Sequence, residues 1–144
     1  RDVYKRQEIA RANKYLGRPY KMRGKVIHGK QRGRLLNFPT ANLEPSFPYV
    51  MPRDGVYLTI TNIRGENYYG LTNIGSNPTF EEGDDKKIET FIFDFNQSIY
   101  GENISVEYIE FLRPDYKFNS AEELIAQMDK DKENGLKYIE NNLK

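Results

Sequence analysis

The spacing of apolar residues predicts that most of this chain is built from strands. Between Tyr20 and Phe111, apolar and polar residues alternate mostly with period two, as in strands that bury one face. The clearest alternation runs over Tyr20–Ile27, and farther along Val56 and Leu58 fall on one face of a second predicted strand together with Ile60. The pattern therefore predicts a mainly β protein.

Turn signals divide this region into short strands. Arg64–Asn67 is typical of a hairpin turn leading into Tyr68–Ile74. A charged loop, Glu81–Lys87, precedes a predicted strand over Ile88–Phe95, and a further turn leads to Ile104–Phe111. Five or six short strands joined by hairpins, with no helix between them, indicate a closed antiparallel β-barrel. We expect six strands in a Greek-key type arrangement, which leaves no sheet edge exposed.

The C-terminal region changes to helical periodicity. Ser120 and Glu123 have the spacing of a capping box at a helix start. An apolar stripe suited to packing on the barrel follows, made by Leu124, Met128, Leu136 and Ile139. Gly135 lies inside the stripe and is expected to weaken or kink the helix.

The N-terminal region predicts a short helix and a tail. Ile9, Asn13 and Leu16 have helical spacing within Glu8–Leu16, and Gly17 is a suitable stop. Residues 1–7 show no pattern, and we assign them no role. The predicted division is a tail at 1–7, a linker helix at 8–17 and one domain at 18–144.

Composition narrows the chemistry. The 144 residues suffice for one domain, and the net charge of +1 argues against a protein devoted to nucleic acid. There is no cysteine and one histidine, His28, which rules out disulfides and thiolate catalysis and makes multi-histidine metal clusters improbable. No apolar run approaches the ~20 residues of a membrane span, and no signal peptide opens the chain, so we expect a cytoplasmic protein without membrane contact.

The segment Leu35–Leu43 carries the first candidate site. Pro39 fixes the backbone, and Thr40 and Asn42, two residues apart, face the same way in an extended segment. A hydroxyl and an amide oxygen on one face are the hard ligands that Mg²⁺ accepts. The alternative is a turn in which both side chains cap the local backbone.

The basic, glycine-spaced run Gly24–Arg34 lies just before this segment. Its backbone N–H groups and cations could hold phosphates, which together with a Mg²⁺ ligand pair suggests a nucleotide site. It is not a P-loop, because Gln31 follows Gly29-Lys30 where Ser or Thr is required and no helix opens there. The alternative interpretation is a solvated basic hairpin.

Glu89 is the candidate for proton transfer. In the predicted strand it shares a face with Phe91, Phe93 and Phe95. A carboxylate at the end of an aromatic stripe is partly desolvated, which suits a general base. The alternative is a strand-end glutamate that faces water.

The segment Phe38–Leu43 and six further blocks in the expected order give the chain a family resemblance from about Glu8 to its end. The six blocks are Leu16–Tyr20, Gly55–Tyr57, Asn73–Gly75 with Pro78–Phe80, Ile88–Thr90, Tyr100–Gly101 and Phe111–Pro114. Together they resemble the riboflavin kinase family, whose bacterial members usually form the C-terminal half of a bifunctional FAD synthetase. The resemblance implies phosphoryl transfer from ATP to the 5′-hydroxyl of riboflavin, giving FMN and ADP. It also implies an upstream FMN adenylyltransferase domain to which nothing in this sequence corresponds.

The resemblance assigns roles to individual residues. Glu89 would be the base, and Thr40 and Asn42 would hold the Mg²⁺ that bridges the phosphates. The remaining contacts would come from Gly29, Gly33, Arg34 and Thr40 for ATP, and from Asn77 and Arg113 for the flavin. The chain departs from the family at Asn37, where glycine is usual, and at Phe91, where histidine is common. For Arg113 the alternative is an ordinary exposed or carboxylate-paired arginine.

Two other functions stay open on the sequence alone. The departures at Asn37 and Phe91 suggest a flavin-binding module without kinase activity. The basic loop and the tyrosines would suit a nucleic-acid-binding barrel, although the near-neutral charge weighs against it.

Overall fold

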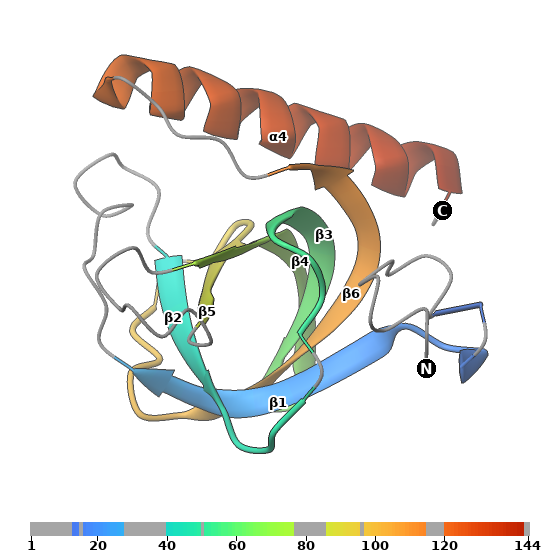
Figure 1. The fold of residues 1–144 in the computed structure, drawn as a ribbon, viewed down its shortest axis with the longest axis vertical. Coiled ribbons are helices and arrows are strands. Elements are labelled where there is room, and N and C mark those ends of the chain that lie inside the picture. Colours follow the sequence, from blue (N-terminus) through green and yellow to red (C-terminus); the bar gives the residue numbers. More distant parts are fainter. Residues whose placement is uncertain are drawn as a thin grey trace.

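The computed structural model describes residues 13–14, 16–27, 40–49, 51–76, 86–95, 97–114 and 120–142. These residues form six strands and a long C-terminal helix (Figure 1). The elements are β1 (Tyr20–Ile27), β2 (Thr40–Pro45), β3 (Gly55–Ile63), β4 (Glu66–Ser76), β5 (Lys86–Ile92), β6 (Asn103–Arg113) and α4 (Ala121–Asn142).

The six strands close into a barrel in the order β1-β2-β5-β4-β3-β6. Each strand is antiparallel to both neighbours, and β6 closes the ring by pairing with β3 on one side and β1 on the other. Closure satisfies the backbone groups that an open sheet would expose at its edges. The predicted antiparallel barrel with a C-terminal helix is therefore confirmed.

Alternate residues of each strand fill the barrel interior. Met22, Gly24 and Val26 of β1 are buried while the residues that alternate with them are exposed, as period two requires. Tyr57 and Tyr108 are fully buried in the same cluster with their rings 5.3 Å apart. Burial raises the pKa of both phenols, so they stay neutral at physiological pH.

A second apolar layer lies on the outside of the barrel under α4. Val56, Leu71 and Phe93 form this smaller cluster, and Figure 1 shows α4 running along the outside of the strands. The buried Gly135 faces it, because a Cβ added there would lie 3.4 Å from Leu58 and 3.5 Å from Leu71. The helix continues through Gly135 without ending there, and the expected weakening of the helix stays a prediction.

The prediction that Leu136 belongs to the apolar stripe facing the barrel was wrong. Leu136 is 46% exposed, whereas Ile139 is 5% exposed and packs inward. The helix turns about 100° per residue, so the close approach at Gly135 leaves Leu136 rotated away from the barrel. The face toward the barrel is thus made partly by a glycine and by Asp131, which is also buried.

The predicted element ends are mostly correct. Ser120 accepts a hydrogen bond from the Glu123 backbone N–H at 3.2 Å, as expected for the N-cap of α4. Arg64 and Gly65 both have positive φ, 53° and 84°, which is typical of a tight hairpin turn between β3 and β4. Gly17 has φ 72° and donates to the Asn13 carbonyl at 2.9 Å, which is the expected helix stop.

One predicted strand ends early, and the predicted N-terminal segments lie mostly outside the described residues. The strand predicted to reach Phe95 ends at Ile92, because Asp94 adopts a left-handed φ of 55° and turns the chain. Phe95 consequently leaves the face of Glu89 and contacts Tyr68 with ring centroids 5.0 Å apart. The predicted N-terminal helix lies mostly outside the described residues, although 13–14 and 16 are helical, and the tail at 1–7 lies wholly outside them.

Candidate functional site

Three polar residues form a row across β2, β5 and β4. Asn42 is the direct cross-strand partner of Glu89, and Glu89 is the direct partner of Asn73 on its other side. Directly paired residues of antiparallel strands have Cβ atoms about 4.5–5.5 Å apart on the same face. The row therefore holds an amide, a carboxylate and a second amide at neighbouring positions.

The row lies on the outer face of the barrel. A residue directly adjacent to each member of the row belongs to the buried interior cluster: Leu43 beside Asn42, Ile88 beside Glu89 and Ile74 beside Asn73. Because side chains alternate along a strand, the row must point outward. The predicted common face for positions 40 and 42 agrees with this register, since Thr40 pairs with Phe91, two residues from Glu89.

Asn42 is buried although it points outward. Its side chain is 7% exposed, and its Oδ1 finds no hydrogen-bond donor in the part of the chain that the structure describes. A buried amide oxygen without a partner is costly, by roughly 1–3 kcal/mol, unless a ligand satisfies it. A cation at Oδ1 would do so, and the atom therefore fits a metal-binding role. The side chain of Thr40, the second predicted ligand, lies outside the described part.

Glu89 is held by a neighbouring lysine. Its Oε1 lies 3.1 Å from Nζ of Lys87, with 27% and 32% of the two side chains exposed. The two residues are two apart on β5 and so share the outer face. Phe91, which follows on the same face, contacts Phe93 in an edge-on arrangement at 5.7 Å. Glu89 thus sits between an ammonium group and an aromatic ring, half-buried, as predicted.

A chain of buried threonine hydroxyls underlies the row. Thr59, Thr72 and Thr90 lie inside the barrel, and the Thr72 hydroxyl is 2.9 Å from each of the other two. Thr90 follows Glu89 in β5, and Thr72 precedes Asn73 in β4. The hydrogen-bonded hydroxyls therefore connect, from inside the barrel, β4 and β5, which are two of the three strands that carry the row outside.

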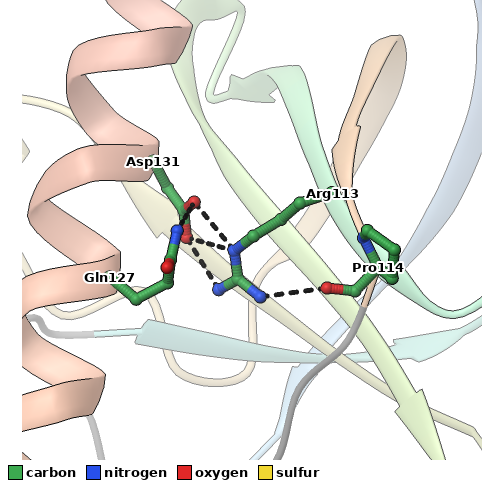
Figure 2. A network of polar contacts seen from close by, with 4 residues as sticks. All are labelled: Arg113, Pro114, Gln127 and Asp131. Atoms are coloured by element: carbon green, nitrogen blue, oxygen red, sulfur yellow. Dashed lines mark hydrogen bonds and ion pairs between the residues drawn. The ribbon is translucent and has the colours of Figure 1, made fainter.

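Arg113 lies at the end of β6 and pairs with the helix (Figure 2). Its Nη2 is 2.7 Å from Oδ2 of Asp131, and its Nε contacts both carboxylate oxygens at 2.8 and 2.9 Å. Gln127, one turn earlier in α4, donates to Asp131 at 2.9 Å, and Arg113 also donates to the Pro114 carbonyl. The side chains of the pair are 12% and 3% exposed. This arrangement is the carboxylate-paired alternative, and a role for Arg113 in flavin binding stays a prediction.

The other predicted contacts lie outside the described residues. They are Gly29, Gly33 and Arg34 for ATP and Asn77 for the flavin, and the departure at Asn37 falls there too. In the described part of the chain, no group of three or more His, Asp or Glu side chains could hold a metal ion.

Asn73 and Lys87, which both lie beside Glu89, were not predicted as site residues from the sequence. Lys87 could have been found, because a residue two positions from Glu89 in a strand must share its face. Asn73 could not, because its place beside Glu89 depends on the register between β4 and β5.

Over the described residues, none of the helices is both long and apolar enough to cross a membrane.

The sequence matches known proteins along most of its length. The family model described as riboflavin kinase, or flavokinase, matches residues 16–139. A bifunctional riboflavin kinase/FMN adenylyltransferase of Listeria monocytogenes is 44% identical over 88% of this chain and 40% of its own length. An RNA-binding riboflavin kinase of Bacillus subtilis is 39% identical over 75% of this chain and 46% of its own length. The chain thus spans less than half the length of these curated relatives.

Solved structures agree on the fold. A structure named as a macrolide-efflux protein from Streptococcus pneumoniae has a TM-score of 0.85 at 38% identity, covering 92% of this chain and 44% of that chain. Riboflavin kinase from Trypanosoma brucei has a TM-score of 0.61 at 21% identity, covering 87% of this chain and 82% of that chain. With the family match over residues 16–139, these findings show that the chain belongs to the riboflavin kinase family.

Proposed function

We propose that this chain is a riboflavin kinase, which transfers the γ-phosphoryl group of ATP to the ribityl 5′-hydroxyl of riboflavin. The products are FMN and ADP. The observation that carries the proposal is the direct pairing of Asn42 with Glu89. It brings a candidate cation ligand and a candidate base within about 5 Å of each other on one surface.

Glu89 acts as the general base in this proposal. Its carboxylate accepts the proton of the 5′-hydroxyl as the oxygen attacks the γ-phosphorus, and the bond from that phosphorus to the β,γ-bridging oxygen breaks. A positioned base of this kind contributes about 10²–10⁴-fold in rate. The half-buried setting between Lys87 and Phe91 supports the assignment, because it orients the carboxylate and partly removes it from water.

Asn42 and Thr40 hold Mg²⁺ in this proposal. The buried Oδ1 of Asn42, which has no hydrogen-bond donor within the described ranges, supports it. The ion, when bound with ATP, neutralises charge on the β- and γ-phosphates, which is how it assists phosphoryl transfer. Gly29, Gly33 and Arg34 hold the nucleotide, as the resemblance implies, and most of the acceleration comes from positioning rather than covalent chemistry.

The flavin and any second activity complete the proposal. Asn77 and Arg113 lie on the flavin side, as the resemblance implies, although Arg113 would need to serve the flavin while paired with Asp131. A bifunctional relative combines the kinase with an FMN adenylyltransferase. We therefore propose that an upstream adenylyltransferase domain accompanies this chain in the longer protein.

The test is incubation of the purified chain with riboflavin, ATP and Mg²⁺, followed by chromatography for FMN. We expect FMN and ADP in equal amounts, and none when Mg²⁺ is replaced by EDTA. A chain that retains flavin but forms no FMN would be a non-catalytic flavin-binding module. A salt-dependent mobility shift with an oligonucleotide, without FMN formation, would instead favour the nucleic-acid-binding alternative.

A further inference from the structure

We propose that Asn73 is a further substrate-binding residue, which hydrogen-bonds the polyhydroxy chain of the acceptor next to the hydroxyl that Glu89 deprotonates. The inference rests on the proposed kinase function and adds to it a residue that binds the acceptor. Its basis is the register of β4 against β5, in which Asn73 and Glu89 are direct partners.

The surface around Glu89 consists of three short rows. On one side Leu71 of β4 pairs with Phe91 of β5, and this row is apolar. On the other side Gly75 of β4 pairs with Lys87 of β5. Glycine has no side chain, so β4 offers no obstruction beside Lys87. The row of Asn73 and Glu89 therefore lies between an apolar row and an open, cationic one.

The three polar members of the central row have different environments. Asn42 is buried, and its Oδ1 has no hydrogen-bond partner among the described residues, which suits the cation. Glu89 is half-buried and ion-paired with Lys87. Asn73 is exposed, and its side chain makes no hydrogen bond to the residues that the structure describes. Among those residues, nothing occupies the hydrogen-bonding groups that it offers to a ligand.

The chemistry of an amide matches a polyol. A carboxylate only accepts hydrogen bonds, whereas an amide both donates and accepts, as each hydroxyl of a polyol does. If one hydroxyl of the acceptor lies at Glu89, its neighbour along the carbon chain can reach the side chain about 5 Å away across the strands. Asn73 would then fix the direction in which the acceptor chain leaves the base.

Asn67, which pairs with Asn62 across β3 and β4, provides a matched control position. Asn67 is exposed like Asn73 and lies six residues earlier in the same strand, so it points to the same outer face. Its Oδ1 accepts from Asn62 at 2.9 Å, at the hairpin end of the strand. Asn67→Ala therefore removes the same chemical group from the same strand away from the row.

The experiment is a fluorescence titration of riboflavin into the chain in the presence of MgADP, for wild type, Asn73→Ala and Asn67→Ala. We expect Asn73→Ala to weaken riboflavin binding about 2- to 12-fold, the range of one neutral hydrogen bond, and Asn67→Ala to leave it unchanged. Lumiflavin, which carries the same ring system without the polyol, should bind wild type and Asn73→Ala equally. In turnover, the KM for riboflavin should rise with the KM for ATP unchanged.

Two results would overturn the inference. One is equal binding of riboflavin by wild type and Asn73→Ala, and the other is an equal loss for riboflavin and lumiflavin. If wild type binds riboflavin but makes no FMN, the proposed activity fails while the titration still decides the role of Asn73. If wild type binds no riboflavin at all, both proposals fall.

Discussion

At the scale of single residues, the barrel interior shows how one hydroxyl can matter more than another of the same kind. Thr72 lies in the middle of the chain of three threonines and contacts both Thr59 and Thr90 at 2.9 Å. Thr61 is equally buried on β3, but its Oγ1 has no hydrogen-bond partner within the described residues. Thr72 and Thr61 are therefore both buried threonines on neighbouring strands, and they differ in whether the hydroxyl is hydrogen-bonded.

Thr72→Val should destabilise the protein by about 1–3 kcal/mol, because it leaves two buried hydroxyls without their shared partner. Thr61→Val, which keeps the shape and removes an unpaired polar atom, should be neutral or stabilising. Denaturant unfolding of the two variants and wild type measures both free energies. Equal losses for the two variants would show that the hydrogen-bonded chain adds nothing to stability.

Single residues also show which features of the site could be predicted from the sequence. The common face of Thr40 and Asn42 follows from period two alone, and so does the neighbourhood of Glu89 and Phe91. The burial of Asn42 does not follow from it, because an outward-pointing residue in a strand is exposed unless another segment covers it. Local pattern thus gives the direction of a side chain but not its environment.

At the scale of elements, α4 shows how packing on the barrel can maintain a helix at a position of low helix propensity. Gly135 is expected to weaken a helix, yet α4 runs through it without interruption. It lies where the helix faces Leu58 and Leu71, and a Cβ there would have ordinary van der Waals contacts of 3.4–3.8 Å. The glycine is tolerated because tertiary packing stabilises a helix whose intrinsic propensity is lower at that point.

Gly135→Ala should therefore stabilise the protein by about 0.5–1 kcal/mol, since the helix propensity improves and the methyl group fits without displacement. Thermal unfolding measures the change. A lower melting temperature would mean that the helix cannot accept the methyl group and that its approach to the barrel is tighter than described.

The second element-scale feature is the ion pair that fastens α4 to the barrel. Asp131 is 3% exposed and holds Arg113 through three hydrogen bonds (Figure 2). Asp131→Asn should destabilise the protein by about 3–5 kcal/mol, because the buried guanidinium loses its counter-charge. Glu133→Gln, which breaks an exposed pair with Lys137, should change the free energy of unfolding by less than about 1 kcal/mol. Denaturant unfolding compares them, and similar small effects would show that the buried pair does not anchor the helix.

The elements also show where prediction from sequence stopped. The hairpin at Arg64–Gly65 and the cap at Ser120 were predictable because their signals are local. The end of β5 was not predictable, because apolar and polar residues go on alternating in the sequence past the left-handed turn at Asp94. Leu136 was misplaced for a similar reason, because only the packing of α4 decides which side of a broken stripe faces the barrel.

At the scale of the whole molecule, the barrel presents two different outer surfaces. Part of the outside, around Val56, Leu71 and Phe93, is apolar, and Leu71 and Phe93 lie close to Gly135 of α4. Figure 1 shows α4 lying outside the barrel. Beside it the outside of β2, β5 and β4 carries the polar row. The row is therefore built on paired strands, and such a support suits a reaction that depends on positioning.

The assembly of the row is a long-range property. Asn42, Glu89 and Asn73 are far apart in the sequence, and two strand registers bring them together. A register shifted by one residue would turn Glu89 into the barrel. The sequence pattern predicted a closed barrel, but it did not predict which strands are neighbours, and the neighbours decide the site.

The central claim is that Glu89 accepts the hydroxyl proton beside a cation held by Asn42. The most direct measurement is kcat for Glu89→Gln, an isosteric change that keeps the hydrogen-bonding shape and removes the base. We expect kcat to fall about 10²–10⁴-fold while riboflavin and ATP still bind and the melting temperature stays close to that of wild type. A kcat within a few-fold of wild type would contradict the account, because the proton would then leave by another route.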